Sequence, residues 1–127
     1  MFKGVGRNTK QIGDDAESLA LAHLVRQGLV LVQRNYRVAG GPHARGAEVD
    51  LILRERDGTL VLVEVRARAG ASHGGALASV GGAKQRRIVR AAMHYLQRLG
   101  APPPCRFDVV ALQEGRIEGI RGALDAG

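Results

Sequence analysis

The sequence predicts a single α/β domain in which a mixed β-sheet of about four to five strands is flanked by two main helices. The chain has 127 residues, of which 45% are hydrophobic and 24% charged, and this composition is typical of one globular domain with its own core. Two segments have helical periodicity, and short β-branched runs lie between and after them. We expect the domain to span residues 13–122, with residues 1–12 as a flexible arm and residues 123–127 as a tail.

Two segments show the spacing of an amphipathic helix. The first is expected from Asp14 to the stop signal at Gly28, and its core face would carry Ala16, Leu19, Ala20 and Leu24. The second is expected over residues 83–99, before Gly100 and a run of prolines, and its core face would carry Ile88, Ala92, Leu96 and Leu99. A glycine-rich loop, residues 70–82, precedes the second helix.

The apolar, β-branched runs predict the strands. They cover residues 29–37, 48–54, 59–66, 107–112 and 116–120. The run from Leu60 to Val65 is nearly continuous, so we expect its strand to be central and covered on both faces.

The turn Arg56-Asp57-Gly58 allows two registers for the hairpin around it. A two-residue turn would place Asp50 and Glu64 on opposite faces. A three-residue loop with Gly58 in the left-handed conformation would pair Glu55 with Thr59 instead.

We adopt the three-residue loop because it separates apolar from charged side chains. In this register Asp50 lies opposite Glu64, and Glu48 lies opposite Arg66. One face is then wholly apolar and carries Val49, Leu51, Leu53, Val61, Val63 and Val65. The other face carries Ile52, Leu60 and Leu62 near the turn and the charged residues at the far end.

The acidic cluster at this far end is the sharpest candidate for a site. Asp50 and Glu64 on neighbouring strands can hold Mg²⁺, which prefers carboxylate oxygens and keeps several waters. Glu64 interrupts an apolar run, where a carboxylate is costly unless a cation meets it. The alternative is a surface salt bridge between Glu48 and Arg66, with the other acids in water.

The chain is basic, with 19 Lys+Arg against 12 Asp+Glu and a formal net charge of +7, which favours an anionic partner such as nucleic acid. Cations concentrate at the start of the second helix, where the helix dipole already favours phosphate. The candidate nucleic-acid contacts there are Lys84, Gln85, Arg86, Arg87 and Arg90. A solvated basic face is the competing interpretation.

Several classes of protein are excluded by what the sequence contains. No apolar run is long enough for a membrane span, and the first residues lack the pattern of a signal peptide, so we expect a cytoplasmic protein. The single Cys105 excludes an internal disulfide framework. The stretch from Gly70 to Gly74 matches G-x-S-x-G, but it opens a glycine-rich loop and not a helix, so we reject a serine hydrolase.

A set of motifs is distributed over most of the chain. They are Glu48-Val49-Asp50-Leu51-Ile52, Leu62-Val63-Glu64-Val65-Arg66-Ala67-Arg68, Glu17 with Ala20 and Leu24, Arg34-Asn35-Tyr36-Arg37, Lys84-Gln85 with Tyr95-Leu96, and Arg106-Phe107-Asp108-Val109. Together these motifs resemble the YraN-like family of small bacterial proteins. The resemblance implies a restriction-endonuclease-like fold related to archaeal Holliday-junction resolvases.

The resemblance further implies a nuclease core of the D…E-x-K type. Asp50, Glu64 and the carbonyl of Val65 would bind Mg²⁺ or Mn²⁺, which would activate a water for phosphodiester hydrolysis. Glu48 and Glu17 would support the metal or its waters. Arg68 and the basic helix would hold nucleic acid, with Gln85 near the site.

Two positions depart from the family pattern. Arg66 stands where the family's lysine is usual, and Ala47 stands where a glycine is usual. Arginine can orient a phosphate, but it cannot deprotonate water near neutral pH. In a catalytic set of Asp50, Glu64, Glu48, Glu17 and Arg66, the arginine would therefore contribute its positive charge and not a proton transfer.

Three functions therefore stay open. The first is a metal-dependent nuclease that acts on DNA, including branched or repair intermediates. The second is a nucleic-acid-binding protein with a degenerate site, which Arg66 favours. The third is a protein-interaction module whose basic surface meets an acidic partner. A homodimer would suit a branched substrate with two symmetric strands.

Overall fold

The structure is a computed structural model that describes residues 9–42, 45–68 and 81–124. In chain order the elements are α1 (Thr9–Arg26), β1 (Val30–Val38), β2 (Ala47–Arg54), β3 (Leu60–Arg68), α3 (Gly82–Gln97), β4 (Cys105–Gln113) and β5 (Arg116–Leu124). Most of the predicted glycine-rich loop, residues 69–80, lies outside the described residues.

The five strands form one mixed sheet in the order β1-β2-β3-β4-β5. Neighbouring strands are antiparallel except for β3 and β4, which are parallel and are connected through α3. This confirms the predicted α/β domain with a mixed sheet and two main helices. The central position of β3 is also confirmed, since Val61 and Val63 on one face and Leu60 and Leu62 on the other are all buried.

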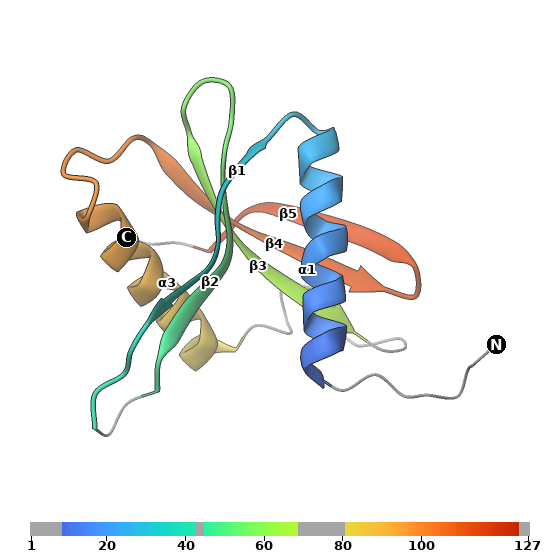
Figure 1. Ribbon diagram of the computed structural model, residues 1–127, viewed down its shortest axis with the longest axis horizontal. Coiled ribbons are helices and arrows are strands. Elements are labelled where there is room, and N and C mark those ends of the chain that lie inside the picture. The colour runs from blue at the N-terminus through green and yellow to red at the C-terminus, as the bar shows by residue number, and fades with distance from the viewer. Residues whose placement is uncertain (1–8, 43–44, 69–80, 125–127) are drawn as a thin grey trace.

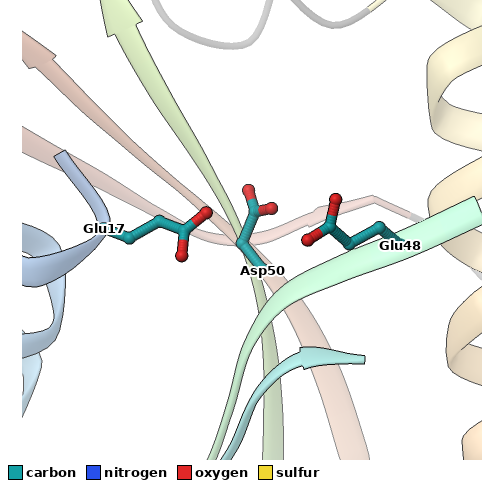
Figure 2. A group of neighbouring side chains, drawn as sticks. All are labelled: Glu17, Glu48 and Asp50. Atoms are coloured by element: carbon teal, nitrogen blue, oxygen red, sulfur yellow. The ribbon is translucent and has the colours of Figure 1, made fainter. Parts of the chain in front are cut away.

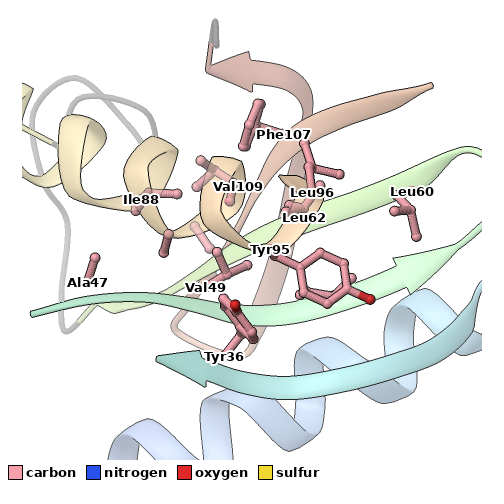
Figure 3. Packing of buried hydrophobic residues seen from close by; sticks show 14 residues of the cluster. Tyr36, Ala47, Val49, Leu60, Leu62, Ile88, Tyr95, Leu96, Phe107 and Val109 are labelled. Carbon is pink, nitrogen blue, oxygen red and sulfur yellow. The ribbon is translucent and has the colours of Figure 1, made fainter. Parts of the chain in front are cut away.

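The two helices cover opposite faces of the sheet (Figure 1). Helix α1 packs Ala20 and Leu24 on one face, over Leu51, Leu53, Val61, Val63 and Val110. Helix α3 covers the other face, where the core includes Tyr36, Val49, Ile52, Leu62, Ile88, Tyr95, Leu96, Phe107 and Val109 (Figure 3). The acidic candidates on β2 and β3 therefore lie in a sheet enclosed by two apolar layers.

The turn between β2 and β3 confirms the three-residue loop. Leu51 pairs with Val63, and the backbone N–H of Glu55 donates to the carbonyl of Thr59 at 2.9 Å. Gly58 has a φ of 95°, a conformation that glycine adopts without steric cost.

The far end of the hairpin departs from the predicted ladder. The β2–β3 pairing runs only from Arg54↔Leu60 to Leu51↔Val63, so Asp50 and Glu64 are not ladder partners. Val49 packs with the α3-facing core, whereas Leu51, two residues later, packs with the α1-facing core. The prediction that Val49 shares a face with Leu51 was wrong, because β2 reverses its in-out alternation at Asp50.

Strand β1 has two irregularities. Its register with β2 shifts between Leu31 and Gln33, and Asn35, which lies between the pairs Arg34↔Leu51 and Tyr36↔Val49, has a φ of 54°. Left-handed backbone in a strand turns the chain, and asparagine tolerates it better than most residues. The two strands therefore bend together where the acidic residues begin.

Some element boundaries also differ from those predicted. Helix α1 begins at Thr9, so residues 9–12, which we expected in the arm, are helical. Strand β5 extends to Leu124, into the predicted tail. Leu19 and Leu99, both predicted on core faces, are 56% and 41% exposed. Within the described residues, no helix combines the length and the apolar character needed to cross a membrane.

Candidate metal and nucleic-acid site

Three carboxylates converge at the bend in β2. Glu17 comes from α1, and Glu48 and Asp50 come from β2 (Figure 2). One carboxylate oxygen of each lies within 4.8 Å of the others, close enough to share a cation. Glu48 and Asp50 lie where β2 reverses its in-out alternation, and Glu17 on α1 reaches both carboxylates.

A fourth acid, Glu64, also neighbours Asp50. The backbone N–H of Val65 donates to Oδ2 of Asp50 at 2.8 Å. The side chain of Asp50 therefore connects β2 to β3 just beyond the last ladder pair, Leu51↔Val63. Burial, together with repulsion from the Glu64 carboxylate, raises the pKa of Asp50 to about 8, and the two side chains also share a hydrogen bond. Glu64 itself is only 3% exposed. The pair therefore needs a proton or a cation between its oxygens.

The other two acids are held by groups on β1. With its amide nitrogen turned toward the carboxylates, Asn35 donates to Oε2 of Glu48 at 2.7 Å and to Oε1 of Glu17 at 3.2 Å. The opposite orientation would press a carbonyl oxygen against two carboxylates. Arg34 pairs with Glu17 and Arg37 with Glu48, each at 3.5 Å. Burial and the nearby Asp50 still raise the pKa of Glu17.

Two cations meet Glu64. Nη1 of Arg66 is 3.4 Å from Oε2 of Glu64, and Nζ of Lys84 is 3.5 Å from the same oxygen. The predicted placement of Glu48 opposite Arg66 in the ladder was wrong, because the β2–β3 ladder ends at Leu51↔Val63, and Arg37 lies at Glu48. Lys84, at the start of α3, brings an ammonium group to the carboxylates from outside β3.

The cations of α3 fall on two sides of the helix. Lys84 and Arg87 line a cleft that contains Glu48 and Asp50. Gln85, Arg86 and Arg90 line a separate groove, and a role for Gln85 near the acidic residues stays a prediction. Val65 contacts Asp50 through its backbone N–H, and the ligand role of its carbonyl stays a prediction. The side chain of Arg68 lies outside the described residues.

Two features of the site escaped the sequence interpretation. One is the role of Asn35 as a bridge between Glu17 and Glu48, although a lone asparagine in a β-strand run was a usable signal. The other is the contact of Lys84 with Glu64, which depends on how α3 packs and has no signature in local spacing.

The chain matches known proteins over most of its length. Residues 16–112 match the model of a family described as uncharacterised protein family UPF0102. The chain belongs to the UPF0102 family. This confirms the resemblance to the YraN-like family.

Relatives from several bacteria are similar to this chain over most of its length. A UPF0102 protein of Methylibium petroleiphilum is 65% identical over 93% of this chain and 97% of its own length. UPF0102 proteins of Acidovorax sp. and Cupriavidus necator are 58% and 56% identical, each over 94% of this chain, and 89% and 86% of their own lengths. A solved structure titled "Crystal structure of SSO0001" aligns with 91% of this chain and 53% of its own, at 17% identity and a TM-score of 0.45.

Proposed function

We propose that this UPF0102 protein is a nuclease-like protein that binds DNA and hydrolyses phosphodiester bonds with Mg²⁺ or Mn²⁺. The observation that carries the proposal is the convergence of Glu17, Glu48 and Asp50, with Glu64 beside Asp50. Branched or repair intermediates are the expected substrates, on the strength of the resemblance stated above.

The donor set fits a hard divalent cation. Every ligand atom offered is a carboxylate oxygen, which suits Mg²⁺ and Mn²⁺ rather than Zn²⁺. The repulsion that raises the pKa of Asp50 is the kind that a bound cation relieves. Asp50, Glu64, Glu48 and Glu17 would hold the ion, directly or through waters. A bound ion would supply an activated water and stabilise charge on the phosphate.

The protein's own groups prepare the site for an anionic substrate. The N–H of Val65 fixes Asp50, so one oxygen of this carboxylate is held in place. Lys84 and Arg66 place two positive charges at Glu64, where they can stabilise charge on a phosphate oxygen. Asn35 keeps Glu17 and Glu48 close without adding charge.

A second candidate function is DNA binding without cleavage. Arg66 favours it, since a guanidinium cannot exchange a proton near neutral pH as a lysine can. The contact between Lys84 and Glu64 favours the catalytic alternative, because it brings a lysine to the carboxylates from another element.

Cleavage assays separate the two candidates. Labelled duplex, flap, four-way junction and single strand are incubated with Mg²⁺ or Mn²⁺ and with wild type, Asp50→Asn or Glu64→Gln. The matched control is Glu118→Gln, which neutralises an exposed acid on β5. Cleavage by wild type and the control, lost in both site variants, is the expected result. Binding without cleavage by any of the proteins would overturn hydrolysis and leave the second candidate.

A further inference from the structure

Beside the carboxylates lies a cleft that the acidic site alone does not explain. It has a volume of about 780 Å³ and lies between the facing ends of β1 and β2 and the start of α3. Glu48 and Asp50 form part of its lining, so the cleft opens directly onto the carboxylates. Any strand lying in it would pass the candidate metal ligands.

The cleft combines positive charge with an apolar floor. Its cations are Arg37, Arg45, Lys84 and Arg87, and its apolar lining includes Val38, Ala39, Ala47 and Ile88. Ala47 and Ile88 are 5% and 2% exposed, so the floor is continuous with the core. A nucleotide strand complements both features, because its backbone is anionic and its sugars and bases are less polar. The lining therefore matches a phosphodiester chain better than a small inorganic anion.

The wall that carries Arg45 contacts both α3 and the end of β1. Nη2 of Arg90 on α3 donates to the backbone carbonyl of Arg45 at 2.6 Å. A Cβ on Gly46 would lie 3.1 Å from the carbonyl oxygen of Val38, so the two sides of the β1–β2 connection are closely packed there. The cleft is thus bounded by a strand end on one side and a helix on the other, with a hydrogen bond between them.

The size of the cleft suits a nucleotide, and the cost of unpairing favours a strand that is already single. Its volume falls within the range of roughly 300–1,000 Å³ for pockets that enclose a small ligand, which is the scale of a nucleotide. A nucleotide in a duplex is stacked and paired, and moving it into a pocket costs a few kcal/mol. An unpaired strand enters without that cost.

We infer that this cleft binds an unpaired nucleic-acid strand and leads it past Asp50 and Glu48. The inference rests on the proposed function and names its substrate class: single-stranded ends, flaps or the open strands of a junction, in preference to continuous duplex. None of the residues that the structure shows lining the cleft is aromatic, so phosphate contacts and not base stacking provide the affinity. Binding is then strongly dependent on salt and tolerant of sequence.

Exposed arginines far from the cleft lining provide a matched test. Arg45→Ala with Arg87→Ala removes two charges from the cleft, and Arg56→Ala with Arg116→Ala removes two charges outside it. Fluorescence anisotropy in EDTA measures binding of a short single strand, as DNA and as RNA, and of a duplex with G·C-rich ends. Because EDTA removes divalent ions, the result does not depend on hydrolysis.

The cleft variant is expected to lose affinity for single strands and to lower the salt slope by about 1.4, the value for two phosphate contacts on a single strand. The control variant is expected to keep the wild-type salt slope on single strands. In neither variant should affinity for duplex fall more than affinity for single strands. Equal loss in both variants, equal loss on duplex and single strand, or no single-strand binding would overturn the inference. If the cleft variant loses single-strand binding but wild type does not cleave in the metal assay, the proposed hydrolysis is overturned and the single-strand inference stands.

Discussion

The backbone N–H of Val65 donates a hydrogen bond of 2.8 Å to Oδ2 of Asp50, at the point where the ladder between β2 and β3 ends. This bond replaces a strand-to-strand backbone contact with a contact to a carboxylate. Asp50 thereby neighbours Glu64 as well as Glu17 and Glu48. The bend in the sheet and the candidate metal site are consequences of the same local structure.

Asp50 should make the folded protein less stable as the pH rises. Its pKa is raised from an ordinary 3.8 to about 8, so between these values the folded state holds a proton that the unfolded state has lost. This contribution to the free energy of unfolding therefore falls from about pH 4 to pH 8, and the full cost persists above pH 8.

Urea unfolding of Asp50→Asn measures this effect, because the amide oxygen can still accept from Val65 and carries no charge. The variant should be more stable than wild type at about pH 8.5, by on the order of 3 kcal/mol, and the difference should shrink toward pH 4. Glu118→Gln serves as the control and should follow wild type. A difference between Asp50→Asn and wild type that does not vary with pH would contradict the raised pKa.

Asn35 should stabilise the site in two separable ways. Its φ of 54° favours asparagine or glycine over alanine, and its amide bridges Glu17 and Glu48. Asn35→Gly removes the bridge without straining the left-handed backbone, and we expect it to cost about 1 kcal/mol. Asn35→Ala also strains the backbone and should cost roughly 1 kcal/mol more. Thermal unfolding of both variants tests this, and an alanine variant as stable as the glycine variant would rule out the strain.

Lys84 should matter more to cleavage than the identity of residue 66. Lys84→Gln removes the ammonium that lies 3.5 Å from Glu64 and should lower the single-turnover rate at least about tenfold. Arg66→Lys keeps a positive charge at the same carboxylate and should retain activity. Lys84→Arg tests whether charge alone is sufficient. Normal cleavage by Lys84→Gln would remove Lys84 from the mechanism.

The sequence predicted those parts of the fold that depend on local chemistry. Gly58 and the apolar alternation determined the register of the β2–β3 hairpin, and the continuous apolar run identified β3 as central. The bend at Asp50 was missed because it depends on the packing of Val49 beneath α3 and on the backbone of Asn35 in another strand. A period-two pattern contains no information about such a reversal.

The site was predicted to a similar degree. Asp50 and Glu64 were expected together and are together, but through a side-chain contact and not through the ladder. The contacts of Glu17 with Glu48 and Asp50, and of Lys84 with Glu64, depend on how α1 and α3 pack on opposite faces of the sheet. Contacts between residues so far apart in the sequence are determined by tertiary packing. The sequence motifs therefore identified the residues but not their contacts.

Calorimetric titration with Mg²⁺ at about pH 8.5 tests the central claim most directly, since most of Asp50 is ionised there. The measurement compares wild type with Asp50→Asn, Glu64→Gln and the exposed control Glu118→Gln. Wild type and the control should bind Mg²⁺, and both site variants should lose binding while keeping their circular dichroism spectra. Unchanged Mg²⁺ binding by Asp50→Asn, or none by folded wild type, would contradict a metal site at these carboxylates.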